Sequence, residues 1–249
     1  TGGNNVAIGS GALLVATTAA DNTAVGTLAL TANTTGTDNT AVGYTAGTAV
    51  TTGSNNTFVG DVSGVAVTTG ASNTAIGADS FKTATTGDHN TALGKQALEA
   101  QTTATGNTAV GSSAGAANTT GATNVFVGYV AGTANTTGTD NVAVGGYALD
   151  ANVTGVNNTA IGHQALSAST QGYNTAVGYN AGLAVSTGQS NVLLGGYVGD
   201  AITTGSDNTG VGQGALSATT TASHNTAVGS GSLDANTTAS YNVAVGSAS

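Results

Sequence analysis

Residues 22–38 read NTAVGTLALTANTTGTD, and residues 39–55 repeat the pattern as NTAVGYTAGTAVTTGSN. Each segment begins with Asn, which is followed by Thr or Val, a small residue, an aliphatic residue and Gly. This Asn occurs fifteen times, from Asn5 to Asn242, at steps of 17 residues except for one step of 16 between Asn158 and Asn174. Self-similarity at a fixed period indicates a chain built from one repeated structural unit.

Positions in the repeat are counted from this Asn, so that +1 is the residue after it. Position +1 is always Thr or Val, +3 is always Val, Ile or Leu, and +4 is Gly in all fifteen copies. A period of two is typical of a β-strand, and we expect +1 and +3 to face the interior. The residues at +8 and +10 predict a second short strand. Thr-Thr-Gly at +12 to +14 predicts the return turn, in which Gly supplies backbone freedom.

We therefore predict an all-β fold, a parallel β-solenoid of fifteen 17-residue coils that forms a single repeat domain over residues 1–249. Stacking in register would place identical residues in columns along the solenoid. The predicted structural ladder of side-chain amides comprises Asn22, Asn39, Asn56, Asn73, Asn90 and Asn107. The predicted turn glycines are Gly26, Gly43, Gly60 and Gly77. The missing residue before Asn174 is expected to be absorbed in the return turn.

Position +2 lies between two residues that we expect to face inward, so it is predicted to point outward. This position is never charged, and an outward apolar column would be an exposed stripe on a single chain. We expect the column to face partner chains at a symmetry axis; a monomer that tolerates a mild Ala stripe is the alternative. The proposed interface residues are Phe58, Phe126, Leu193, Ala24, Ala41 and Ala75.

A longer period is superimposed on the repeat. At +8, two large residues alternate with two glycines, and the large +2 residues fall on the second glycine coil of each set. Position +11 is often aliphatic in the same coils, as at Val50 and Val67. We hypothesise that neighbouring columns refill the volume that the +8 glycines leave empty.

The charge balance excludes several classes of function. Eleven acidic residues face two basic ones, Lys82 and Lys95. Binding to nucleic acid or to anionic lipid needs many more cations, so we expect neither partner. No apolar run approaches the length of a membrane span, and without cysteine there is no disulfide or thiolate site.

No group of side chains suggests catalysis, so we expect no enzyme activity, no cofactor and no metal site. His89, His163 and His224 lie in separate coils, and the aspartates before several repeat asparagines are interpreted as solubilising turn residues. The tyrosines at +5 and +6 are interpreted as turn packing, with stacking on sugars as the alternative; they are Tyr44, Tyr129, Tyr147, Tyr179 and Tyr197. Paired threonines at +12 and +13 form ranks of hydroxyls that could accept O-glycans or present an ice-like array.

Segments such as Asn22-Thr-Ala-Val-Gly26 resemble the head repeats of YadA-like trimeric autotransporter adhesins and similar repeats in phage and viral fibres. The resemblance covers the whole chain, although the repeats of that family are usually shorter than 17 residues. It implies a left-handed β-roll, a side-by-side homotrimer and an extracellular role on a cell surface or virion fibre. The implied partners are other copies of the chain and a host-surface protein or glycan.

Because the sequence opens inside a return turn and stops within a coil, we expect it to be a fragment of a longer fibrous chain. The leading hypothesis is the structural rod of an adhesin or fibre that mediates surface attachment. The alternative is a monomeric ice-binding solenoid with a Thr-rich face. A solenoid enzyme of the polysaccharide-lyase type is disfavoured because two lysines cannot line a basic cleft.

Overall fold

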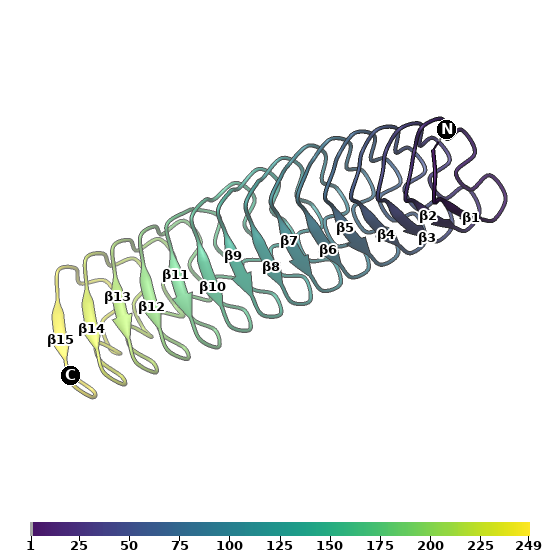
Figure 1. The fold of residues 1–249 in the computed structure, drawn as a ribbon. Helices are drawn as coiled ribbons and strands as arrows, with labels where there is room; N and C mark the ends of the chain where they lie inside the picture. Colours follow the sequence, from purple (N-terminus) through teal and green to yellow (C-terminus); the bar gives the residue numbers. More distant parts are fainter. Residues whose placement is uncertain (1) are drawn as a thin grey trace. The chain divides into compact units, whose positions relative to one another are not determined.

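The computed structural model describes residues 2–249 and shows a parallel β-solenoid with no helix in that range. It comprises two compact units, one ending at Thr123 and the other beginning at Asn124. Each coil contributes one three-residue strand, and within each unit the strands lie side by side in chain order (Figure 1). The strands of the first unit are β1 (Val6–Ile8), β2 (Thr23–Val25), β3 (Thr40–Val42), β4 (Thr57–Val59), β5 (Thr74–Ile76), β6 (Thr91–Leu93) and β7 (Thr108–Val110). Those of the second are β8 (Val125–Val127), β9 (Val142–Val144), β10 (Thr159–Ile161), β11 (Thr175–Val177), β12 (Val192–Leu194), β13 (Thr209–Val211), β14 (Thr226–Val228) and β15 (Val243–Val245).

Neighbouring strands pair in register, as the 17-residue period predicts. Thr23 lies opposite Thr40, and Val25 lies opposite Val42. The 16-residue step keeps the same register, because Thr159 of β10 pairs with Thr175 of β11. The in-phase stacking of the coils and the absorption of the deletion outside the strand are therefore confirmed.

The prediction for the two faces of the strand is wrong. The middle residue, at +2, points into the core, and +1 and +3 point outward. Six residues predicted to contact partner chains have no exposed surface within the single chain: Phe58, Phe126, Leu193, Ala24, Ala41 and Ala75. A period of two fixes which residues share a face but does not fix which face is buried. Here the narrow interior takes one side chain from each strand, alanine in most coils, rather than two β-branched or aliphatic ones.

The second predicted strand does not form. Residues +5 to +10 form a series of tight turns, in which +6 and +8 adopt left-handed backbone conformations, such as Leu28 with φ 59° and Leu30 with φ 49°. Left-handed residues reverse the chain within a few positions, as a short coil requires. Hydrogen bonds between coils continue through the turns, as from Leu30 N to Ala46 O at 3.1 Å. Positions +7 and +8 are inside, but Ala32 at +10 is only half-buried.

Glycine is required at +4 and at +14 for different reasons. The predicted turn glycines at +4 are confirmed, with φ of 131° at Gly26 and 136° at Gly77. A Cβ on Gly26 would also lie 2.3 Å from Gly43 O in the next coil. The return-turn glycine at +14 does not have a positive φ. A Cβ on Gly36 would lie 2.2 Å from Gly53 O, so close approach of the coils requires this glycine, rather than backbone freedom.

The hypothesis that neighbouring columns refill the space at the +8 glycines is confirmed. Phe58 fills that space in two coils, because a Cβ on Gly47 or Gly64 would lie 2.8 or 2.5 Å from its ring. Val50 and Val67 at +11 are fully buried in the same coils. The interior is thus kept close-packed although the large side chains change position along the solenoid.

Candidate functional site

Side-chain amides form a hydrogen-bonded ladder inside each unit. Asn22 Oδ1 accepts bonds from the backbone N–H and the Nδ2 of Asn39, at 3.0 and 3.1 Å. Asn39 Nδ2 also donates to Gly53 O at 2.9 Å. The prediction is confirmed for the fully buried Asn22, Asn39 and Asn56, and for Asn73, Asn90 and Asn107. At Asn107 the Nδ2 donates to Gln101 Oε1 at 3.1 Å, while its backbone N–H keeps the bond to Asn90.

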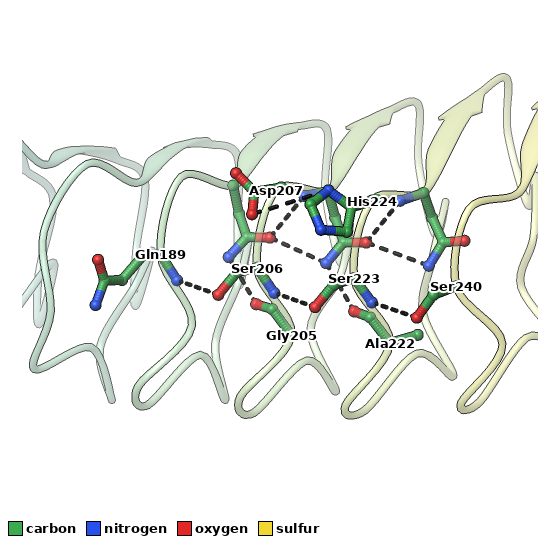
Figure 2. A network of polar contacts seen from close by, with 11 residues as sticks. Gln189, Gly205, Ser206, Asp207, Ala222, Ser223, His224 and Ser240 are labelled. Carbon is green, nitrogen blue, oxygen red and sulfur yellow. Dashed lines mark hydrogen bonds and ion pairs between the residues drawn. The ribbon is translucent and has the colours of Figure 1, made fainter.

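A second set of side-chain bonds joins the return turns of the last coils (Figure 2). The backbone N–H of Gln189 donates to Ser206 Oγ, that of Ser206 to Ser223 Oγ and that of Ser223 to Ser240 Oγ, each at 3.0 Å. Each serine thus replaces a backbone acceptor for the preceding coil. Because each serine stands two residues before a ladder asparagine, these bonds reinforce the same corner of the coil as the asparagine ladder.

The threonines at +12 do not form a free hydroxyl array. Thr34 Oγ1 donates to Thr51 O at 3.1 Å, and Thr51 Oγ1 donates to Thr68 O at 3.2 Å. These hydroxyls stabilise the stacking of the return turns. The interpretation of the +12 column as an ice-like surface is not supported by this geometry.

The outward-facing residues of the strands, at +1 and +3, form a surface that we call the strand face. It carries no charged residue in any of the fifteen coils, and its +3 column is partly exposed, as at Val42, Ile76, Ile161 and Val228. In the first unit the +1 column is an uninterrupted run of threonines at 23, 40, 57, 74, 91 and 108. These hydroxyls make no hydrogen bond to another residue in the described part of the chain.

Aromatic rings from five successive coils of the second unit form one exposed column. Its members are Tyr129, Tyr147, His163, Tyr179 and Tyr197. His163 was expected only to lie in a coil separate from the other histidines, and its place between Tyr147 and Tyr179 was not predicted. A signal was present: Gly-Gly-Tyr-x-x-Asp occurs at 145–150 and again at 195–200.

The acidic side chains do not gather into a site for a metal. Among residues 2–249, no three His, Cys, Asp or Glu side chains come together as ligands. Asp207 Oδ2 lies 4.0 Å from His224 Nδ1, and Asp21 accepts a bond from Asn4 at 3.0 Å. Burial raises the pKa of Asp150 and the pKa of Asp200 above the usual value of 3.8. No pocket is present among the described residues.

Comparison with known proteins places the chain in no established group. No family model, no curated protein and no solved structure matches it. Between residues 2 and 249 no helix is both long and apolar enough for a membrane span.

Proposed function

We propose that the chain is the structural rod of an extracellular adhesin or fibre, on a cell surface or a virion, that mediates surface attachment. The observation that carries this proposal is the asparagine ladder, which adds side-chain bonds to the backbone bonds between successive coils. Asn39 alone donates twice to Asn22 and once to Gly53, and the arrangement repeats from coil to coil. Hydrogen bonds that recur at every coil suit a protein that spans a distance and bears load.

We further propose that the solenoid is a left-handed β-roll and that copies of the chain associate side by side through the strand face as a homotrimer. The +2 column cannot serve this purpose because it is buried. The strand face is partly apolar and uncharged, whereas the chain carries a net charge of −9. A second copy of this chain is therefore repelled least along this face. Partly exposed valines and isoleucines would be removed from water on association.

The mass of the chain in solution, measured by light scattering, tests this proposal. We expect three times the 23.3 kDa of a single chain. The double variant Val42→Asp/Ile76→Asp places carboxylates on the strand face and is expected to reduce the mass to that of one chain. The control Thr35→Asp adds a carboxylate at an exposed return turn and should leave the trimer intact. A single-chain mass for the unsubstituted protein, or a trimer that tolerates both aspartates, would refute the association.

A second candidate function, ice binding by a monomer, is favoured by the threonines of the strand face. Their hydroxyls and methyl groups repeat at the spacing of neighbouring strands, about 4.8 Å. Aliphatic side chains at +3 form a parallel second rank, as Val25 and Val42 do beside Thr23 and Thr40. Thermal hysteresis in a sample that light scattering shows to be monomeric would support this function over the fibre. The variant Thr74→Lys should then lose the hysteresis. A trimer without hysteresis would exclude it.

A further inference from the structure

The aromatic column continues without a gap through five coils of the second unit. The ring centroids of Tyr129 and Tyr147 are 5.4 Å apart, and those of Tyr147 and His163 are 5.9 Å apart. The column continues from His163 to Tyr179 at 5.5 Å and from Tyr179 to Tyr197 at 5.2 Å. Backbone bonds hold these positions, such as Tyr147 N to Tyr129 O at 3.0 Å and Tyr197 N to Tyr179 O at 2.9 Å.

The rings are not interior packing residues. Tyr129, Tyr147, Tyr179 and Tyr197 remain 56%, 38%, 49% and 45% exposed, whereas Phe58 in the core is fully buried. The ring planes also alternate. His163 and Tyr179 stack with an interplanar angle of 11°, but Tyr147 is turned by 70° from His163 and Tyr197 by 63° from Tyr179. The turned rings at 147 and 197 therefore do not stack face to face along the column.

Unpartnered hydrogen-bond acceptors occur in the same coils. Within the described part of the chain, three buried side-chain atoms have no hydrogen-bond partner: Asp150 Oδ1, Asn180 Oδ1 and Asp200 Oδ1. All three belong to coils that contribute a ring to the column. A buried acceptor without a partner is costly, so three of them in coils that carry the aromatic column point to donors that come from a ligand.

Contacts at the same repeat positions in other coils indicate that these acceptors lie close to the rings. Tyr147 and Asp150 occupy positions +6 and +9 of one coil, as do Tyr197 and Asp200. In other coils the same two positions are in direct contact: Lys82 Nζ lies 2.9 Å from Asp79 Oδ1, and Gln96 Nε2 donates to Glu99 Oε2 at 3.0 Å. Asn180 is itself at +6, next to Tyr179. Rotation of an exposed tyrosine, which occurs in nanoseconds, would open the neighbouring oxygen to a ligand.

We propose that the aromatic column binds a linear, uncharged polysaccharide. A pyranose ring offers a C–H face that packs on an aromatic ring, and its hydroxyls are donors for the three free oxygens. Coils are spaced by about 4.8 Å, a length similar to the advance of an extended sugar chain per residue, so one chain could pack on both turned rings, Tyr147 and Tyr197. The second unit, which carries the column, contains no lysine or arginine, so it offers no such side chain to pair with a sulfated or sialylated glycan.

This inference deepens the proposed attachment role by naming its ligand class, but it does not require the strand face or a trimer. The probes are cellohexaose and mannohexaose, with heparin and a polyproline peptide as competing occupants. The chain contains seven tyrosines and no tryptophan, so a change in tyrosine emission reports binding directly. We expect saturable binding of at least one neutral hexasaccharide and none of heparin or polyproline.

The variant Tyr147→Ala/Tyr197→Ala should weaken that binding about tenfold or more, and Asp150→Ala/Asp200→Ala should weaken it as well. The matched control is Tyr44→Ala, which removes a 57% exposed tyrosine outside the column and should change nothing. Circular dichroism and thermal melting of each variant show that it is folded. Binding of neither hexasaccharide, equal losses in the Tyr44 control, or preference for polyproline would overturn the proposal. Because mass is measured on the same samples, failure of glycan binding remains distinct from failure of the trimer.

Discussion

The ring of Phe58 occupies the space above Gly64, where a Cβ would lie 2.5 Å from Phe58 Cδ1. The same ring also lies against Gly47 of the preceding coil, where an added Cβ would be 2.8 Å from Phe58 Cδ2. A large side chain at +2 therefore depends on glycine at +8 in two adjacent coils. This dependence explains why the two columns change together along the sequence.

The first prediction concerns this pair. Phe58→Ala should lower the free energy of unfolding by about 3–5 kcal/mol, because it leaves a cavity in a close-packed core. Gly64→Leu alone should also destabilise the protein, because the added side chain collides with the ring. The double variant should recover part of the loss, since Ala at +2 with Leu at +8 is the natural arrangement at Ala24 and Leu30. Urea unfolding measures all three, and strictly additive losses would contradict the coupling.

A second prediction tests the asparagine ladder. Asn73→Ala removes an oxygen that accepts two bonds from Asn90, and it leaves the backbone N–H of Asn90 and the carbonyl oxygen of Gly87 without a partner. Asn56 Oδ1 keeps the bond from the backbone N–H of residue 73. Each buried group left without a partner costs about 1–3 kcal/mol, so the two groups should lower the free energy of unfolding by about 2–6 kcal/mol. Thr86→Ala, at an exposed position of the return turn in the same region, is the control and should change stability by less than about 0.5 kcal/mol. A similar loss in both variants of the urea experiment would argue against a special role for the ladder.

A third prediction distinguishes two reasons for glycine, a positive φ and the close approach of the next coil. Gly106, with φ 71°, has only Thr123 Cγ2 at 3.6 Å from an added Cβ, so Gly106→Ala should cost about 1–2 kcal/mol. Gly77 has φ 136° and its Cβ would lie 2.5 Å from Gly94 O, so Gly77→Ala should cost several times more or prevent folding. Soluble yield and the midpoint of thermal unfolding compare the two. Equal tolerance of alanine would show that the coils can move apart.

The fourth prediction concerns pH. Burial raises the pKa of Asp150 and the pKa of Asp200 in the folded protein above 3.8, so the native state binds protons more tightly than the unfolded state. Both groups therefore destabilise the fold when ionised, and this penalty is relieved as the pH falls from neutrality toward 3.8. Asp150→Asn/Asp200→Asn should raise the melting temperature at pH 7, and the advantage should shrink at lower pH. Melting curves over this range check the result, and an advantage that is independent of pH would contradict it.

The periodic features of the fold could be predicted from the sequence because each coil repeats them. The spacing of Asn22 and Asn39 predicts the register, and the invariant glycine after each strand predicts a turn. The buried face could not be predicted, since a Thr-Ala-Val strand offers no side that is plainly polar. The second strand could not be excluded either. Left-handed backbone at Leu28 and Leu30 turns the chain so that the consecutive residues Ala29 and Leu30 are both buried, whereas the sequence alone suggested alternation.

The candidate site was less accessible to prediction for a different reason. Members of the column come from two different repeat positions, such as Tyr129 at +5 and Tyr147 at +6. When the repeats are aligned, these residues fall in different columns, although their rings are in contact in the structure. His163 completes the column although it belongs to another residue type. The unpartnered oxygen of Asp150 depends on its local surroundings, which no spacing rule describes.

The coil from Asn158 to Asn174 loses one residue while its neighbours keep their pairing, and Gln171 O takes the place of a glycine carbonyl as acceptor for Asn158. This corner of the coil therefore absorbs the loss of one residue without a change in strand register. A short foreign peptide grafted beside Gln171 would be displayed at a defined coil. Grafts at the equivalent corners of other coils in the same unit would be spaced by multiples of the distance between neighbouring strands, about 4.8 Å.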